Sequence, residues 1–303
     1  QGADAAVMLE YARLPGSGRS SLVELTRPVA PGGNIILGDE DAARGQRVLE
    51  AGRRIRPAEI GLLAAFGQLT VQVVRRPWAA VLASGDEVVP MDQTPRKGQV
   101  RDLNSQAVRA AAVSAGARVR LLGRCPDDLE QLAGLIRSAL ADCEVLVITG
   151  GSSAGERDFT LKAFQAVAGT QILAHGAAVS PGKPLIAARQ GRKVLLGLPG
   201  HPAGALVTAE IFLKEIIFRL TGLSRSFKAK VQARVTRPLP SAQGRRDYFR
   251  VRLREGPDGL AAEPILGRSG LISTLADADG LAICPEDQEG LPEGAWAEIH
   301  LLD

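Results

Sequence analysis

The chain has 303 residues, of which 45% are apolar and 23% are charged, and its formal net charge is +4. This balance excludes intrinsic disorder as the dominant state. No apolar run approaches the roughly 20 residues that cross a bilayer, and the N-terminus lacks the pattern of a secretory signal, so we expect no membrane partner. Aromatic residues make up only 4% and no dense Lys/Arg block occurs, so we expect no nucleic-acid partner either.

Cysteine and histidine are scarce. An odd number of widely spaced cysteines predicts buried thiols in a reducing, cytoplasmic setting rather than a disulfide framework or a structural zinc site. They are Cys125, Cys143 and Cys284. With only three histidines in the chain, histidine-based zinc catalysis is not expected.

Two segments precede the main body of the chain. Residues 1–33 alternate apolar and polar side chains and predict part of a small β domain. Residues 34–76 hold glycine-rich turns and a predicted helix at 57–66, with proline in its first turn. We interpret 34–76 as a linker and helical domain segment.

The region 77–222 alternates strand and helix patterns. Strands are expected at 78–83, 118–122, 144–149, 185–188 and 194–198, and helices at 105–115, 128–140, 161–167 and 203–220. This alternation predicts an α/β domain with a mostly parallel sheet covered by helices. After residue 222, period-two runs at 230–236, 248–253 and 296–301 predict a small all-β domain over 223–303.

A glycine-rich turn follows the apolar strand at 144–149. Gly150 and Gly151 allow a backbone to approach a phosphate closely, and Ser152 and Ser153 add hydroxyl donors. Neither a Walker A lysine nor a GxGxxG spacing is present, so the turn predicts neither an ATPase nor a dinucleotide site. A strand-to-helix turn that binds no ligand is the alternative.

Acidic residues follow several predicted strands. Ligands of open parallel sheets bind beyond the carboxyl ends of the strands, and carboxylates that meet there can hold Mg²⁺. The candidates are Glu87, Asp102 and Asp158. Each acid taken alone is more often a helix cap or a solvated turn residue, but their recurrence at successive strand ends favours the metal hypothesis.

Two rigid Pro/Gly turns lie at the edges of the last strands of the region. Lys183, within SPGKP, is a cation suited to a phosphate or another oxyanion. Pro199 and Gly200, within LPGHP, precede a predicted helix whose first N–H groups would face an anion. We interpret His201 as a turn residue rather than a general base.

The ordered set of turns resembles one protein family. The segments ASGDEV, RDLN, TGGSSAGERDFT, SPGKP and LPGHPAG, in this order, are similar to the molybdopterin-binding fold. The flanking regions resemble its MoeA branch, the molybdenum insertases that include the gephyrin E domain. The resemblance covers nearly the whole chain from Gly2. It implies a three-layer α/β/α domain, a barrel-like C-terminal β domain and a chain that is incomplete at its N-terminus.

The resemblance also implies a reaction and a set of site residues. The reaction is the Mg²⁺-dependent insertion of molybdate into adenylated molybdopterin with release of AMP, in a homodimer that has molybdopterin adenylyltransferase as a partner. The implied catalytic acids are Glu87, Asp102, Asp158 and Asp41, the first three also as metal ligands. The implied ligand-binding residues are Gly150, Gly151, Ser152, Ser153, Lys183, Pro199, Gly200, Arg250 and Ser269.

Several positions depart from the family pattern. Ser180 stands where the family has a lysine, which removes one expected cation near molybdate, and His201 stands where asparagine is commoner. Two alternatives therefore stay open, a molybdopterin adenylyltransferase and a non-catalytic module that binds the cofactor. The all-β region after residue 222 counts against the first, whereas Ser180 and the incomplete N-terminus support the second.

Overall fold

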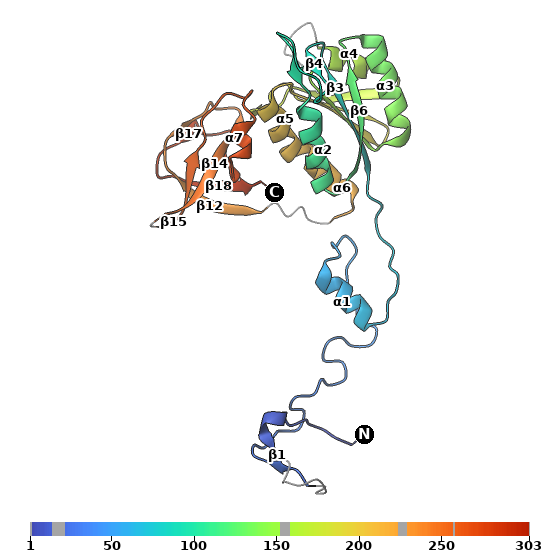
Figure 1. Ribbon diagram of the computed structural model, residues 1–303, viewed down its shortest axis with the longest axis vertical. Helices are drawn as coiled ribbons and strands as arrows, with labels where there is room; N and C mark the ends of the chain where they lie inside the picture. Colours follow the sequence, from blue (N-terminus) through green and yellow to red (C-terminus); the bar gives the residue numbers. More distant parts are fainter. Residues whose placement is uncertain (1, 14–21, 152–157, 224–228, 257, 303) are drawn as a thin grey trace. The chain divides into compact units, whose positions relative to one another are not determined.

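The computed structural model describes residues 2–13, 22–151, 158–223, 229–256 and 258–302 (Figure 1). The chain divides into two compact units, residues 1–63 and 64–303, and each is described by itself. The three cysteines are buried and unpaired, as predicted. No helix in the described ranges combines the length and the apolar character needed to span a membrane.

The N-terminal unit has little regular structure. A 3-10 turn at Leu9–Tyr11 precedes β1 (Ala12–Arg13) and β2 (Glu24–Leu25), which pair antiparallel as the β-type segment predicted for this region. Helix α1 (Pro57–Ala65) begins at the predicted proline.

One buried carboxylate stabilises the start of α1 through two ion pairs. Glu59 is buried, and its Oε1 lies 2.6 Å from Nη2 of Arg53 and 2.8 Å from Nη2 of Arg56. The hydrogen bond from the Arg56 guanidinium is the main cause that holds the pKa of Glu59 well below its usual range. Because the pKa is depressed in the folded chain, ionised Glu59 stabilises this unit above the ordinary carboxyl pKa of about 4.3, and the contribution is lost as the pH falls.

We predict that Glu59→Gln loosens α1, because neutralising this side chain leaves two arginines without their shared carboxylate. Amide hydrogen exchange across residues 57–65, measured by mass spectrometry at pH 7, should be faster in the variant than in the unmodified chain. The matched control is Glu50→Gln, which removes an exposed ion pair with Arg47 and should leave exchange unchanged. Equal exchange in Glu59→Gln and the unmodified chain would contradict the assignment.

The central sheet has the strand order β6-β3-β7-β11-β10-β8. The first four strands run parallel, which confirms the mostly parallel sheet, whereas β10 runs antiparallel to both of its neighbours, β11 and β8. A two-residue turn joins β10 to β11, and so short a connection permits only an antiparallel pair. The strands are β3 (Trp78–Ser84), β6 (Arg118–Cys125), β7 (Val145–Thr149), β8 (Thr170–His175), β10 (Ile186–Gln190) and β11 (Lys193–Leu198).

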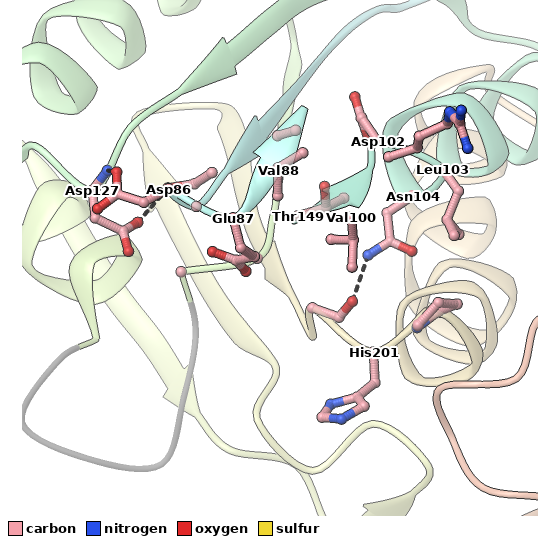
Figure 2. A pocket seen from close by; sticks show the side chains of 18 of the residues that line it. Asp86, Glu87, Val88, Val100, Asp102, Leu103, Asn104, Asp127, Thr149 and His201 are labelled. Atoms are coloured by element: carbon pink, nitrogen blue, oxygen red, sulfur yellow. Dashed lines mark hydrogen bonds between the residues drawn. The ribbon is translucent and has the colours of Figure 1, made fainter. Parts of the chain in front are cut away.

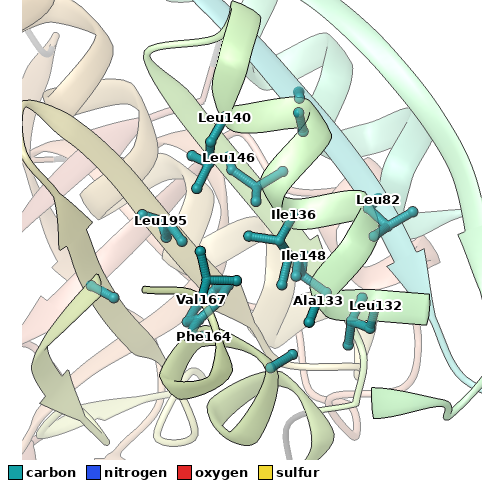
Figure 3. Close-up of a cluster of buried hydrophobic side chains, with 14 of the residues drawn as sticks. Leu82, Leu132, Ala133, Ile136, Leu140, Leu146, Ile148, Phe164, Val167 and Leu195 are labelled. Atoms are coloured by element: carbon teal, nitrogen blue, oxygen red, sulfur yellow. The ribbon is translucent and has the colours of Figure 1, made fainter. Parts of the chain in front are cut away.

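Helices cover both faces of this sheet and form three layers (Figure 1). One face carries α3 (Leu129–Asp142) and α4 (Phe159–Ala166), and Figure 3 shows their side chains packed on β3 and β7. The other face carries α2 (Asn104–Ser114), α5 (Pro202–Thr208) and α6 (Lys214–Leu220). The long helix expected at 203–220 is present, with a π-helical turn at Ala209–Leu213 between α5 and α6.

The C-terminal region forms a closed barrel. Strands pair in the order β15-β12-β18-β16-β14, and a further β14–β15 pairing closes the ring, which confirms the barrel-like prediction. The short strand β9 (Val179–Ser180) pairs with β14 and ties the SPGKP turn to the barrel. The barrel strands are β12 (Lys230–Val235), β14 (Arg246–Gly256), β15 (Gly259–Pro264), β16 (Gly280–Cys284) and β18 (Trp296–Leu301). Outside the ring lie β13 (Leu239–Pro240), β17 (Gly290–Leu291) and helix α7 (Ser273–Ala276).

Candidate functional site

A pocket of about 860 Å³ opens at the carboxyl ends of β3 and β7 (Figure 2). Its walls come from segments far apart in the chain: the turn after β3, the short strands β4 (Val88–Val89) and β5 (Val100–Arg101), the start of α2, the turn after β7, and the start of α5. The loop before α7 adds Gly270. A parallel sheet places ligands at this edge.

The glycine turn after β7 is shaped by close backbone packing. Gly150 has φ +87° and Gly151 has φ +62°, and both line the pocket. A Cβ on Gly150 would lie 2.2 Å from the carbonyl oxygen of Ser84, and one on Gly151 would lie 2.9 Å from Oγ1 of Thr160. Only glycine fits either position, so the turn presents bare backbone to the pocket. The predicted ligand residues Ser152 and Ser153 lie outside the described residues.

We predict that Gly150→Ala destabilises the second unit by about 2 kcal/mol or more, because a positive φ and a backbone clash add together. Gly123→Ala is the matched control, since Gly123 has φ +81° but a Cβ added there would meet nothing within 4 Å. It should cost about 1 kcal/mol from the backbone conformation alone. Urea unfolding midpoints measure the difference, and equal losses in the two variants would refute the role given to the clash.

Three carboxylates gather on one side of the pocket. Asp86 and Glu87 follow β3, Asp127 follows β6, and all three line the cavity. Oδ1 of Asp86 accepts a hydrogen bond of 3.1 Å from the backbone N–H of Asp127, and the Ser84 hydroxyl donates to Oδ1 of Asp127 at 3.4 Å. Burial, followed by the charges of Asp86 and Glu87, raises the pKa of Asp127. The result is a crowded, electronegative wall.

Asp127 is a pocket residue that the sequence did not single out. Two adjacent acids follow β6, and either can cap the next helix. In the structure Asp128 is the cap, with its side chain accepting from the N–H of Gln131, which leaves Asp127 directed toward the cavity. The sequence did hold a signal for this residue. One helix needs only one N-cap, so one of the two adjacent acids was left free for another role.

Asp102 and Asp158, which were predicted as metal ligands together with Glu87, accept hydrogen bonds from backbone N–H groups at the starts of helices. Asp102 lines the pocket, and its carboxylate accepts from the N–H and the hydroxyl of Ser105 at the start of α2. Asp158 is buried and caps α4 by accepting from the N–H of Leu161 at 2.9 Å. Its Oδ2 also lies 3.2 Å from Nε2 of His175, and Asp158 is not among the pocket-lining residues.

Glu87, Asp102 and Asp158 are therefore not brought together as one ligand set. Within the described residues, no group of three His, Cys, Asp or Glu side chains has the geometry of a metal site. Glu87 instead has Asp86 and Asp127 as its acidic neighbours. The fourth predicted acid, Asp41, is exposed in the N-terminal unit.

The two Pro/Gly turns differ in their relation to the pocket. Gly200 lines it, and a Cβ there would lie 3.6 Å from the Cα of Gly150, so the two glycine turns are in contact. Pro199 precedes this position and packs on Gly204 of α5. Lys183 is exposed and is not among the pocket-lining residues.

The C-terminal barrel reaches the pocket through one loop. The carbonyl of Ser269 accepts a hydrogen bond of 3.0 Å from the N–H of Ala203, so the first N–H group of α5 contacts the chain itself and not solvent. Arg250 donates from Nη2 to the carbonyl of Gly267 at 2.8 Å, while its Nε and Nη1 are buried without a partner among the described residues. Burial lowers the pKa of Arg250.

Family models match three consecutive parts of the chain. Residues 1–67 match the MoeA N-terminal region (domain I and II), residues 80–219 match a probable molybdopterin-binding domain, and residues 232–302 match the MoeA C-terminal region (domain IV). The fold is thus that of a molybdopterin-binding protein with the MoeA domain order.

Comparison with individual proteins gives the same family as the family models. The molybdopterin molybdenumtransferase of Bacillus subtilis (strain 168) is 31% identical over 303 residues, which cover 100% of this chain and 70% of the relative. A putative molybdopterin biosynthesis protein of Methanocaldococcus jannaschii is 28% identical, covering 99% of this chain and 73% of that protein. A crystal structure of the MoeA protein of Pyrococcus horikoshii superposes with a TM-score of 0.79 at 30% identity, covering 98% of this chain and 72% of that one. The chain belongs to the molybdopterin molybdenumtransferase (MoeA) family, transferases of molybdenum cofactor biosynthesis.

Proposed function

We propose that this chain inserts molybdate into adenylated molybdopterin and releases AMP. The observation that carries the proposal is the pocket itself, where a bare glycine turn faces a wall of carboxylates at one sheet edge. A pyrophosphate-linked pterin needs close backbone approach, which Gly150 and Gly151 provide. Attack of water on its phosphoanhydride then yields AMP and leaves the second phosphate on the pterin. The adenylated substrate itself would come from an adenylyltransferase.

The carboxylates suit a hard cation. Asp86, Glu87 and Asp127 offer oxygen ligands. Burial, followed by the charges of Asp86 and Glu87, raises the pKa of Asp127, and a cation would offset that negative charge. Mg²⁺ usually keeps several waters and takes only one or two protein carboxylates, so a preformed set of three is not required. Mg²⁺ held there would neutralise charge that develops on the phosphates during cleavage. The chain's own part is to present these oxygens and to hold the phosphates against the glycine turn.

We predict that Asp127→Asn lowers molybdate-dependent AMP release at least about 100-fold, because the change removes a charge from the reacting edge of the pocket. Chromatography of AMP, after incubation with adenylated molybdopterin, Mg²⁺ and molybdate, measures the rate. Asp128→Asn is the matched control, since Asp128 caps α3 and asparagine caps equally well. Undiminished AMP release in Asp127→Asn would remove this residue from the reaction.

The same assay separates the alternatives. Tight binding of adenylated molybdopterin without AMP release would identify a non-catalytic module. Ser180, which stands where the family has a lysine, supports this alternative. Consumption of ATP in the presence of molybdopterin would identify an adenylyltransferase.

We also propose that the chain acts as a homodimer. The first unit leaves large apolar side chains in solvent, among them Leu9 at 87% and Ile36 at 86% exposure. Exposed apolar surface beyond a few hundred Å² is typical of protein interfaces. Sedimentation velocity at micromolar concentration should give the mass of two chains, and Ile36→Asp should shift the population toward one chain. A monomer under these conditions would contradict the proposal.

A further inference from the structure

The glycine turn after β7 is held in place by a residue of α4. Thr160 is fully buried, and its hydroxyl donates to the carbonyl oxygen of Gly150 at 3.1 Å. The methyl group of the same side chain packs on β11, where a Cβ added to Gly197 would lie 2.8 Å from Cγ2 of Thr160. Because Thr160 is confined on two sides, the position of Gly150 depends on the position of the first turn of α4.

Asp158 in turn fixes the start of α4. Its side chain is buried, and its Oδ1 accepts a hydrogen bond of 2.9 Å from the N–H of Leu161. This cap occupies one carboxylate oxygen and leaves the other, Oδ2, in need of a donor. A buried acceptor without a donor is unfavourable, and more so when it carries charge. The side chain therefore keeps its capping conformation only where a second group satisfies Oδ2.

His175 supplies that second group. Its Nε2 lies 3.2 Å from Oδ2 of Asp158, and donation to an ionised carboxylate requires the ring proton on this nitrogen. Among the residues that the structure describes, Oδ2 has His175 as its partner. The histidine is the last residue of β8, and pairing opposite Ile186 holds its backbone in the sheet. The imidazole is 45% exposed, so packing alone does not account for it.

These contacts form a continuous route from the edge of the sheet to the pocket. The edge strand β8 carries His175, which contacts Asp158 at the start of α4, and Thr160 of the same helix contacts Gly150. Of these four described residues, only Gly150 lines the pocket. A side chain that no substrate touches is thus connected to the turn that faces the substrate.

We propose that His175 is a positioning residue for the reaction, which acts through Asp158 and the start of α4 on the glycine turn. The inference rests on the proposed function and adds a residue outside the pocket that determines the geometry inside it. It also gives Asp158 a positioning role in place of the metal-ligand role that the sequence predicted.

Backbone amide NMR tests the route without any substrate. His175→Ala should shift the amide resonances of Gly150 and Gly151, because Asp158 loses the partner of Oδ2. His175→Gln, whose side-chain nitrogen reaches about as far as Nε2, should restore them, whereas His175→Asn is too short and should behave as His175→Ala. The matched control is His300→Ala, which removes another imidazole–carboxylate pair, with Glu298 of the barrel, and should leave both resonances unchanged.

Kinetics distinguish positioning from a merely structural role. In His175→Ala, kcat for molybdate-dependent AMP release should fall about tenfold and KM should stay within about threefold, because the substrate contacts remain but the turn that orients the phosphates is displaced. His175→Gln should recover most of kcat. A structural contribution alone would lower the urea unfolding midpoint and leave kcat of the folded enzyme unchanged.

A double-mutant cycle tests whether the effect travels through α4. Thr160→Val keeps the shape of the side chain and removes the hydroxyl that donates to Gly150. Once this link is cut, adding His175→Ala should lower kcat by less than about twofold more. Two full losses that multiply would overturn the route through Thr160.

The outcomes separate this inference from the proposed function. Unchanged amide resonances of Gly150 and Gly151 in both His175→Ala and His175→Asn would overturn the inference and leave the proposed function standing. A lowered urea midpoint with unchanged kcat would overturn it as well. Failure of the unmodified chain to release AMP would overturn the proposed function, while the amide resonances, which need no substrate, would still decide whether His175 positions the turn.

Discussion

The site depends on the contact between the turn after β7 and the end of β3. A Cβ at Gly150 would lie 2.2 Å from the carbonyl oxygen of Ser84, so these two backbones touch where neighbouring parallel strands end. This contact fixes the glycine turn relative to Asp86 and Glu87, which follow Ser84 directly. The burial of β3 and β7 between two helical layers keeps both strand ends in register. The pocket is thus a consequence of sheet packing.

Much of the fold was predictable because its signals are local. The fully apolar run of β7, the helical spacing of α3 and the proline at the start of α1 each specify an element within a few residues. The direction of a strand is not local in this way, and β10 is antiparallel only because a two-residue turn joins it to β11. Edge strand β8 was missed because most of its side chains are exposed and show no apolar alternation.

The sequence could predict where the site lies, but not which contacts each of its side chains makes. Gly150, Gly151 and Gly200 line the pocket because motif turns at strand ends share one sheet edge. Sequence cannot show which acid will cap a helix, since capping depends on the geometry of the next turn. The carboxylate of Asp158 is directed toward α4 and His175. Asp127 was not predicted as a pocket residue, because the sequence did not show that the adjacent Asp128 caps α3.

The pocket collects carboxylates from strand ends and from a helix start because both meet at one edge of the sheet. Asp86, Glu87 and Asp127 follow β3 and β6, whereas Asp102 stands at the start of α2. A hydrogen bond from the Asn104 side chain to the carbonyl of Gly200 joins the start of α2 to the turn before α5. The phosphoanhydride cleavage that we propose requires that charge be stabilised where it develops while the remaining phosphate is held still, and a bare glycine turn beside carboxylates suits both requirements.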